Sequence, residues 1–453
     1  MQSFYEATVA RSAGHSSAYA PLTGRRSVNV CIIGGGLAGL STALGLAERG
    51  VADIAVLEAE QVGFGASGRN GGFVFGGYSL DCADLLKTLG PARARELYTL
   101  TTDAVDLMRK RIQRYRIDCD VTDAGVILAN WFDEPARLDT QRRMMRDSFG
   151  VEWEHVTAAA LASQLKTSRY HGGLFERNAF HFHPLKYVLG VAGAAANAGV
   201  QIHEKSPVVR LQRGGARRDG ARRGGARRDD ARRGGAGFVV HTPHGALEAR
   251  HVVMAGGGYA RNVYPRVERA VLPIATYVMA TEPLGARLND AIATRAAVYD
   301  TRFAFDYYRP LPDTRILWGG RISVRDRAPE IIARLLRRDL LKVYPQLHDV
   351  QIEHAWGGLM SYARHKMPQI GRSTDGVWYA VGFGGHGMAP TTVSGELLAA
   401  AISGERPVPD AFAAFGLTPT YGALGLAAAQ LTYTAMQTRD ALAARRPTTR
   451  STS

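Results

Sequence analysis

Gly34, Gly36 and Gly39 are the residues whose type and spacing most directly predict chemistry. In a G-x-G-x-x-G motif the first glycine makes a tight turn, the second lets a pyrophosphate reach the backbone, and the third lets a helix pack closely on a strand. Leu37 and Ala38 lie in the turn that leads into a helix, where unpaired N–H groups and the positive end of the helix dipole attract phosphate. The motif therefore predicts a dinucleotide-binding site.

The segments around this motif predict a βαβ unit. Residues 28–33 form an apolar strand, residues 40–50 have the apolar spacing of a helix, and residues 52–60 contain a second strand. Glu58, near the end of that strand, can accept hydrogen bonds from the hydroxyls of a ribose, and a carboxylate there disfavours the 2′-phosphate of NADP. The unit alone does not distinguish FAD from NAD.

Other glycine-rich segments favour FAD. The segment "GFGASGRNGG" (63–72) follows Glu58 directly and would bring backbone amides along the ribityl chain toward a flavin ring. The segment "GFGGHGMAPTTVSGE" (382–396) is a glycine turn that leads into a helix, whose N-terminus can point at the electron-rich edge of a reduced flavin. "HVVMAGGG" (251–258) adds a third backbone approach. The cofactor-binding residues expected from these segments and from a neighbouring strand are Ala66, Ser67, Arg69, Asn70, Gly71, Val208, Gly256, Gly384, Gly387 and Met388.

The order of segments along the chain predicts two interleaved domains. We expect an α/β and α+β fold, with a discontinuous, Rossmann-like FAD-binding domain of the glutathione-reductase type and an antiparallel-sheet substrate domain. The expected FAD-binding parts are 27–90, 180–265 and 366–404, the expected substrate-domain parts are 91–179 and 266–365, and residues 405–453 form a C-terminal helix and tail that could pack on the FAD-binding domain.

The three glycine segments, in this order, resemble the D-amino-acid-oxidase-like (glycine and sarcosine oxidase) family of FAD-dependent oxidoreductases. Within that family the chain is most similar to the branch that oxidises γ-glutamylputrescine. The similarity runs over nearly the whole chain and is carried by "SFYEAT", "GFGASGRNGG", "RIQRYRIDCD", "HFHPLK", "DYYRPLPDTRILWGG", "VYPQLHDVQIEHAWGG", "KMPQIGR" and "GFGGHG".

The resemblance implies oxidation of a C–N bond. Hydride passes from the carbon next to nitrogen to flavin N5, the imine hydrolyses, and O2 or another acceptor reoxidises the flavin. No cysteine follows Cys119, so we expect FAD to be bound without a thioether link. Met360 and Ala389 stand where relatives place carboxylate-binding cations, and Trp318 stands where relatives place a lysine that promotes reaction with O2. These departures favour a γ-glutamylputrescine-like amine as substrate, with a D-amino-acid dehydrogenase or an N-methyl-amino-acid oxidase as alternatives.

Three residues are candidates for catalysis. His386, in the last glycine turn, is expected near the flavin or in a packed hydrogen bond. Tyr307 and Tyr308 alternate on a strand, so one faces the cavity, and we expect Tyr308 to be that one. Trp356 either walls the pocket or packs in the core. Arg69 either neutralises charge on the cofactor or pairs with a nearby carboxylate.

Much of the formal net charge of +15 has a local source, because the Arg-rich repeat over residues 214–236 contributes +5 through eight arginines and three aspartates. This repeat contains no apolar residue larger than alanine, so we expect a disordered hairpin loop rather than a packed element. A polyanion-binding arm is the alternative, although nucleic acid is not favoured because no aromatic residue is interleaved for base stacking. His181 and His183 lack further ligands, so no metal site is expected. The chain has no apolar run long enough for a membrane span and only three scattered cysteines, which favours the cytoplasm.

Overall fold

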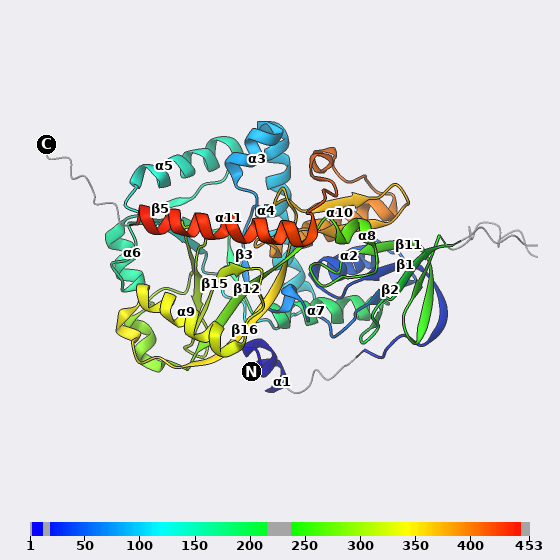
Figure 1. Cartoon of the computed structure of the whole chain (residues 1–453), viewed down its shortest axis with the longest axis horizontal. Helices are drawn as coiled ribbons and strands as arrows, with labels where there is room; N and C mark the ends of the chain where they lie inside the picture. The colour runs from blue at the N-terminus through cyan, green and yellow to red at the C-terminus, as the bar shows by residue number, and fades with distance from the viewer. Residues whose placement is uncertain (1, 12–18, 215–236, 445–453) are drawn as a thin grey trace, which may run out of the picture.

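The computed structural model describes residues 2–11, 19–214 and 237–444, and it contains two large sheets that lie next to each other (Figure 1). The first sheet has the path β17-β18-β11-β1-β2-β8, with β10 and β9 joined to β11. Its strands are β1 (Gly24–Ile33), β2 (Ile54–Leu57), β8 (Gln201–His203), β9 (Arg210–Arg213), β10 (Phe238–His241), β11 (Gly245–Met254), β17 (Gln369–Arg372) and β18 (Trp378–Val381).

The first sheet is buried on both faces, as the continuous apolar sequence of β1 predicts. The central pairs β1–β2, β1–β11 and β2–β8 are parallel. Val30 and Ile32 pack on one face with α2 (Leu37–Glu48), α7 (Pro184–Asn197) and α10 (Met388–Ser403), whereas Cys31 and Ile33 pack on the other face. This arrangement is the one that the βαβ unit predicts, and we call it the FAD-binding domain after the role expected from the sequence.

The second sheet has the order β16-β12-β15-β14-β13-β4-β6-β5, and we call the part of the molecule built on it the substrate domain after the role expected from the sequence. It is mostly antiparallel, with β13 and β4 paired in parallel. Its strands are β4 (Val126–Ala129), β5 (Glu154–Val156), β6 (Gly173–Glu176), β12 (Leu272–Thr281), β13 (Ala297–Asp300), β14 (Tyr307–Pro310), β15 (Ile316–Ser323) and β16 (Ile352–Tyr362), and a short pair joins β3 (Phe73–Val74) to β7 (Phe180–His181). The two sheets therefore take their strands from the chain in alternation, and the fold class expected from the sequence is confirmed.

The remaining helices cover the two sheets. They are α1 (Phe4–Arg11), α3 (Cys82–Leu89), α4 (Pro91–Arg114), α5 (Pro135–Met144), α6 (Ala158–Leu165), α8 (Pro265–Glu268), α9 (Pro329–Val343) and α11 (Gly422–Ala443). The apolar side of α9, with Ile332, Leu336 and Leu340, packs on the face of the second sheet that points away from the cavity described below.

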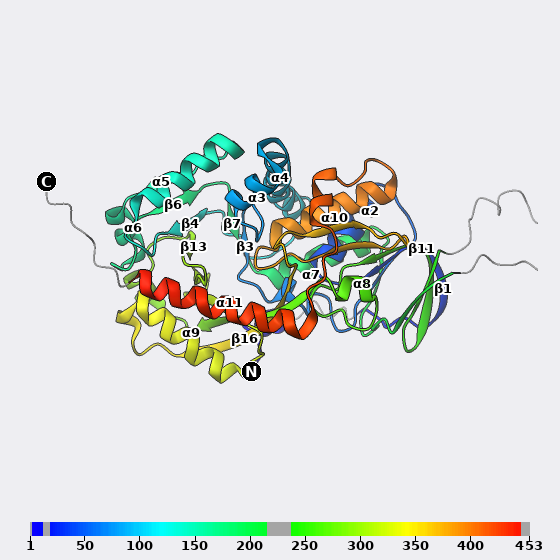
Figure 2. The ribbon, with the colours of Figure 1, turned by 45° about the horizontal axis from the view of Figure 1, so that its top comes forward.

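The C-terminal helix α11 packs on the substrate sheet, not on the FAD-binding domain as the sequence suggested. Figures 1 and 2 show it running along that sheet. The hydroxyl of Tyr433 accepts a hydrogen bond from the Ile322 N–H at 2.8 Å, and Asp440 accepts one from the Phe303 N–H at 2.8 Å. Both hydrogen bonds join α11 to residues that lie far away in the sequence. Most of the Arg-rich repeat lies outside the described residues, and the strands that flank it, β9 and β10, pair antiparallel.

A buried arginine joins three helices of the FAD-binding domain. Arg111 on α4 is 1% exposed, and it donates to Glu48 on α2 at 2.6 Å and to Glu396 on α10 at 2.5 Å. Desolvation opposes ionisation of Glu48, but the hydrogen bond and charge of Arg111 outweigh it and lower the pKa of Glu48. Helix α4 therefore lies with the helices of the FAD-binding domain, although its residues fall in the segment expected for the substrate domain.

We expect Arg111→Ala to lower the free energy of unfolding by about 3–5 kcal/mol, because it removes the buried cation between Glu48 and Glu396 and leaves them only the more exposed Arg114 and Arg49. Arg109→Ala is the matched control on the same helix, where the exposed partners Asp106 and Asp123 predict a loss below about 1 kcal/mol. Urea unfolding of both variants measures the difference. Equal losses would contradict a special role for the Arg111 junction.

Candidate cofactor and substrate site

A cavity of about 1230 Å³ lies between the two sheets. Its lining combines the α2 turn, the glycine segment 63–72, the end of β11, strand β16 and the start of α10. All of the expected cofactor-binding residues except Gly39 line it: Gly34, Gly36, Leu37, Ala38, Glu58, Ala66, Ser67, Arg69, Asn70, Gly71, Val208, Gly256, Gly384, Gly387 and Met388. Gly39 packs behind the turn, where an added Cβ would lie 2.1 Å from the carbonyl oxygen of Gly34. The structure thus brings together segments that are far apart in the sequence.

The turn before α2 has the geometry of a phosphate cradle. Gly34 has a φ of +118°, which side chains rarely tolerate, and a Cβ on Gly36 would lie 3.1 Å from Ser67 Oγ. Ser67 Oγ accepts a hydrogen bond from the Leu37 N–H at 2.9 Å. Within the described residues, no hydrogen bond uses the amides of Gly36 and Ala38. These amides at a helix N-terminus are available to an anionic group.

Glu58 closes one end of this cradle. Its carboxylate accepts from the Gly35 N–H at 2.6 Å and from the Glu60 N–H at 2.9 Å. Burial raises the pKa of Glu58, and these backbone hydrogen bonds oppose that rise. Each carboxylate oxygen keeps lone pairs that can accept from ribose hydroxyls, so the arrangement fits the adenosine end of FAD.

The glycine segment 63–72 is held by hydrogen bonds to its carbonyl groups. The Asn70 side chain donates to the carbonyl groups of Ala66 and Ser67 at 3.0 and 2.9 Å, and it accepts from the Gly72 N–H at 2.8 Å. None of the described groups bonds to the amides of Asn70 and Gly71, which line the cavity. Two successive free N–H groups suit the acceptor atoms of a flavin or its ribityl chain.

Residues outside the cavity fix the same segment. The Tyr5 hydroxyl on α1 donates to the Asn70 carbonyl at 2.8 Å, and the buried Arg309 on β14 donates to the Gly71 carbonyl at 2.8 Å. The Trp356 indole donates to the Arg69 carbonyl at 2.9 Å. Tyr5 and Arg309 lie in segments that carry the family resemblance, but the sequence did not predict their roles, because both act across long sequence separations.

The structure corrects the placement of Trp356. Its side chain packs with Tyr5 behind the glycine segment, with 5.2 Å between ring centroids, and it does not line the cavity. Arg69 does line the cavity, yet its guanidinium pairs with Glu6 at 3.1 Å and donates to the Phe64 carbonyl at 2.7 Å. A role of Arg69 toward the cofactor stays a prediction.

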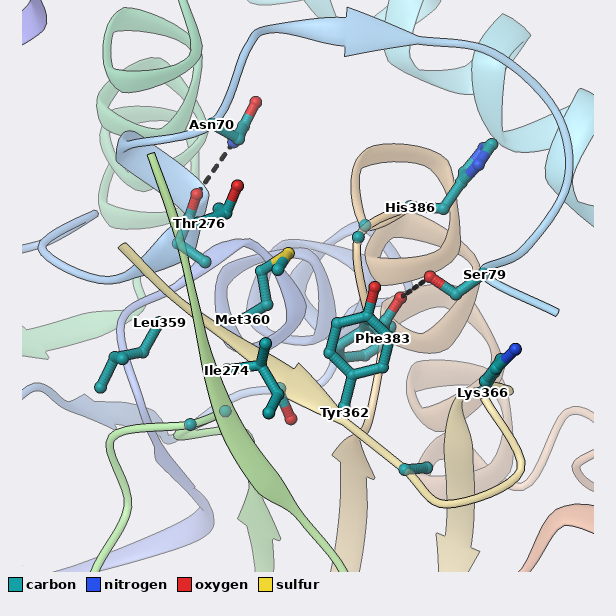
Figure 3. Close-up of a pocket in the computed structure, with 18 of the residues that line it drawn as sticks. Asn70, Ser79, Ile274, Thr276, Leu359, Met360, Tyr362, Lys366, Phe383 and His386 are labelled. Carbon is teal, nitrogen blue, oxygen red and sulfur yellow. Dashed lines mark hydrogen bonds between the residues drawn. The ribbon is translucent and has the colours of Figure 1, made fainter. Parts of the chain in front are cut away.

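His386 lies beside the start of α10, as Figure 3 shows together with Asn70 and Met360 around the same space. Its ring packs against Phe75 with centroids 4.2 Å apart, and Nε2 is 3.4 Å from the Phe75 carbonyl oxygen. Burial lowers the pKa of His386 to about 4, so the imidazole is neutral at physiological pH. A neutral ring with its proton on Nε2 leaves Nδ1 as an acceptor. The hydroxyl of Ser79 closes the neighbouring turn by donating to the Phe383 carbonyl at 3.3 Å.

Tyr307, not Tyr308, faces the cavity. The Tyr307 ring lies across from Gly319, whose added Cβ would meet Tyr307 at 2.1 Å, so the glycine makes room for the ring. Tyr308 is fully buried on the opposite face, stacked on Trp318 at 4.4 Å and hydrogen-bonded to Tyr170 and Tyr344 at 3.2 Å. The strand alternation predicted that the two tyrosines diverge, but the assignment of Tyr308 to the cavity was wrong.

An aromatic wall extends from His386 along the substrate side of the cavity. Successive ring centroids lie 4.2 to 6.3 Å apart, and the rings belong to Phe73, Phe75, Tyr299, Phe305 and Tyr307. Met360 and Ala389 also line the cavity, whereas Trp318 is buried in the core and has no access to it. The substrate side is therefore largely apolar near the cofactor cradle, and the comparison of Trp318 with a cavity lysine does not hold.

The fold and the site define a dinucleotide-binding oxidoreductase. The family model described as FAD dependent oxidoreductase matches residues 29–401. The chain belongs to this family of FAD-dependent oxidoreductases. FAD is its cofactor, and it is an enzyme that acts on the CH–NH groups of amines.

Relatives and solved structures agree with this assignment. The chain is 33% identical over 436 residues to the γ-glutamylputrescine oxidoreductase of Escherichia coli, covering 95% of this chain and 96% of the relative. It is 32% identical to a probable oxidoreductase of Haemophilus influenzae, with 89% of each chain covered. The glycine oxidase of Geobacillus kaustophilus has the same fold, with a TM-score of 0.69 at 20% identity over 86% of this chain and 98% of that chain.

The described residues contain no group of three or more His, Cys, Asp or Glu side chains arranged to hold a metal ion. His181 instead contacts the Arg295 carbonyl at 2.8 Å, and burial lowers its pKa to about 3. None of the described helices is long and apolar enough to cross a membrane.

We expect Gly36→Ala to weaken FAD binding at least tenfold, because the new Cβ would stand against Ser67 Oγ at the phosphate cradle. Gly193→Ala in α7 is the control, since nothing lies within 4 Å of its added Cβ. Flavin absorbance per protein and FAD titration of the apoprotein measure both. Full flavin retention by Gly36→Ala would contradict this position for the phosphates.

Arg69→Ala should reduce FAD affinity or shift the flavin redox potential if the guanidinium acts on the cofactor. Glu6→Gln removes the carboxylate partner of Arg69 but keeps the cation, so it separates the two roles. Flavin content and potentiometry are the readouts. A loss of equal size in both variants would assign Arg69 to the local ion pair with Glu6.

Proposed function

We propose that this enzyme oxidises the C–N bond of an extended amine of the γ-glutamylputrescine type, with no carboxylate on the reacting carbon. The observation that carries the proposal is the pair Met360 and Ala389, uncharged side chains that line the cavity near the cradle. These two positions offer no cation to a carboxylate on the reacting carbon, and desolvating an unpaired carboxylate is costly. Arg364 and Lys366, which are cations of the lining, belong to the loop that follows β16. The similarity to γ-glutamylputrescine oxidoreductase along nearly the whole chain supports the same substrate class.

The aromatic wall suits an amine that arrives protonated and reacts as the neutral base. The π faces of Phe75, Tyr299 and Tyr307 can stabilise an entering ammonium. Loss of water in this apolar space then favours the neutral amine, because desolvation disfavours the charged form. Neutral His386 adds no positive charge next to the amine and offers Nδ1 as a proton acceptor.

The main role of the residues of the chain is to bind and orient the cofactor and the amine, rather than to transfer protons. FAD, when bound, accepts the hydride from the carbon beside the nitrogen. The glycine segment 63–72 and the start of α10 hold the cofactor, while Tyr307 and Phe75 orient the amine and exclude water. The imine product hydrolyses after release, and an electron acceptor, O2 or another oxidant, completes the cycle.

Anaerobic titration of the holoenzyme tests this proposal. We expect γ-glutamylputrescine and related extended amines to bleach the flavin absorbance at micromolar to millimolar concentrations. Glycine, sarcosine and D-alanine should bleach it at least a hundredfold less efficiently. Reduction by the amino acids alone would favour the alternative of an amino-acid dehydrogenase or N-methyl-amino-acid oxidase. Mixing the reduced enzyme with O2 or with a quinone then identifies the acceptor.

The two adjacent tyrosines provide a matched pair. Tyr307→Phe removes a hydroxyl beside the cavity, so we expect kcat/KM for the best amine to fall about three- to tenfold with little change in stability. Tyr308→Phe removes two core hydrogen bonds, so it should lower the free energy of unfolding by about 1 kcal/mol and leave kcat/KM within twofold. The reverse pattern would place Tyr308 at the substrate after all.

A further inference from the structure

Buried polar atoms without partners lie at and behind the part of the cavity lining that contains Tyr98, which we call the arm of the cavity. The Tyr98 hydroxyl on α4, Trp153 Nε1 before β5 and Glu176 Oε2 at the end of β6 have no hydrogen-bond partner. Tyr98 and Trp153 line the cavity and are 2% and 7% exposed. Such groups are costly to bury alone, so their presence together beside a cavity indicates a site for a polar ligand group.

Glu176 lies directly behind this lining. It is 6% exposed and points from the cavity face of the substrate sheet, on the same side of β6 as the core residue Leu174. Burial raises the pKa of Glu176 to about 8, opposed by a hydrogen bond from the Gly76 N–H. Among the described residues, no lysine, arginine or histidine forms an ion pair with this carboxyl group.

The other titratable groups around Glu176 stay neutral near pH 8. They are Tyr98 on α4, Cys82 on α3 and Tyr299 on β13, and a negative charge on Glu176 disfavours the ionised form of each of them. Burial raises the pKa of each of them, that of Cys82 to about 12. Glu176 is therefore the group in this arm whose charge changes between pH 7 and 9.

The arm begins next to the reacting end of the cavity. An added Cβ on Gly77 would lie 3.7 Å from His386 Cε1, and one on Gly76 would lie 3.1 Å from the Tyr98 hydroxyl. Phe75, which contacts both His386 and Tyr299, stands between the two ends. A substrate chain can therefore place one nitrogen near His386 and a second polar group near Tyr98.

We propose that Tyr98 and Glu176 form a subsite for a second ammonium group at the far end of the substrate, so that the enzyme prefers diamines and amines with a distal ammonium over monoamines of equal length. This inference rests on the proposed function as an oxidase of extended amines. The unpartnered carboxylate oxygen and the tyrosine hydroxyl supply acceptors, and an ammonium supplies three donors. An ion pair formed in this low-dielectric arm would be stronger than one in water.

The pH dependence has a defined sign. Below pH 8 the carboxyl group of the free enzyme is protonated, and binding of an ammonium favours its ionised form, so binding releases a proton. The advantage of a diamine over the matched monoamine should therefore grow with pH up to about 8, by as much as tenfold per pH unit. Above that pH the advantage should level off until the distal amine itself loses its charge.

The experiment compares 1,4-diaminobutane with n-butylamine, which has the same carbon chain, using anaerobic flavin bleaching and kcat/KM between pH 6.5 and 9. γ-Glutamylputrescine serves as the reference substrate of the proposed function. In the wild-type enzyme we expect a preference for the amines that carry a distal ammonium, rising with pH. Glu176→Gln should lower the diamine-to-monoamine ratio of kcat/KM at least tenfold and remove its pH dependence. Glu154→Gln on the adjacent strand, an exposed partner of Arg177, should leave the ratio unchanged.

Several outcomes would overturn the inference. An unchanged ratio in a Glu176→Gln enzyme that retains FAD would do so, as would a wild-type ratio that does not vary with pH. If Glu176→Gln fails to fold, Tyr98→Phe tests the same arm and should lower the ratio at least threefold. Bleaching by monoamines without any diamine preference rejects this subsite but leaves the proposed function intact, whereas bleaching by none of the amines rejects the proposed function as well.

Discussion

The buried guanidinium of Arg309 is the interaction on which the site depends. It is 2% exposed, and none of the described carboxylates forms an ion pair with it. It donates instead to the carbonyl groups of Gly71 and Phe182, both at 2.8 Å, and contacts the Tyr5 hydroxyl at 3.5 Å. A buried charge costs several kcal/mol unless hydrogen bonds surround it, so these carbonyl groups are held tightly in place. One side chain from the substrate sheet thus fixes the cofactor-binding segment of the other domain.

The orientation of the peptide groups follows from this constraint. With the carbonyl groups of Arg69, Asn70 and Gly71 turned toward Trp356, Tyr5 and Arg309, the amides of Asn70 and Gly71 are left to the cavity. Oriented amides of this kind act as fixed partial positive charges and need no reorganisation when a ligand binds. Burial lowers the pKa values of His181 and His183, and the charge of Arg309 lowers them further, to about 3. Both histidines are therefore neutral, and they add no positive charge to the groups that support the segment.

The sequence predicts the residues that form the cofactor cradle, but it does not predict the residues that hold the cradle in place. Gly34, Gly36 and Glu58 act through local backbone geometry, so their spacing alone predicts their role, and the structure places them together. Tyr307 and Tyr308 show how far such a prediction reaches. Strand alternation predicts that their side chains lie on opposite faces of the sheet. Which of the two faces the cavity depends on the pairing of Tyr307 with Gly319, which lies on another strand. The sequence left open whether Trp356 lines the pocket or packs in the core, and it misplaced α11, because the contacts of both cross long sequence separations. The roles of Arg309 and Glu176 are not visible in the sequence, since burial and missing partners become visible only in three dimensions.

The two ends of the cavity impose opposite electrostatic conditions on a long amine. Near the cradle, His386 is neutral, Met360 and Ala389 are uncharged, and the aromatic wall excludes water, so this end favours the neutral amine that hydride transfer requires. At the far arm, an unpartnered carboxyl group favours a charged ammonium. Two nitrogens of similar basicity in solution are therefore made chemically different by where they bind. Because exchanging the two ends would place an ammonium against the neutral wall and a neutral amine against the carboxyl group, the same residues that hold the substrate also select which of its C–N bonds faces the flavin.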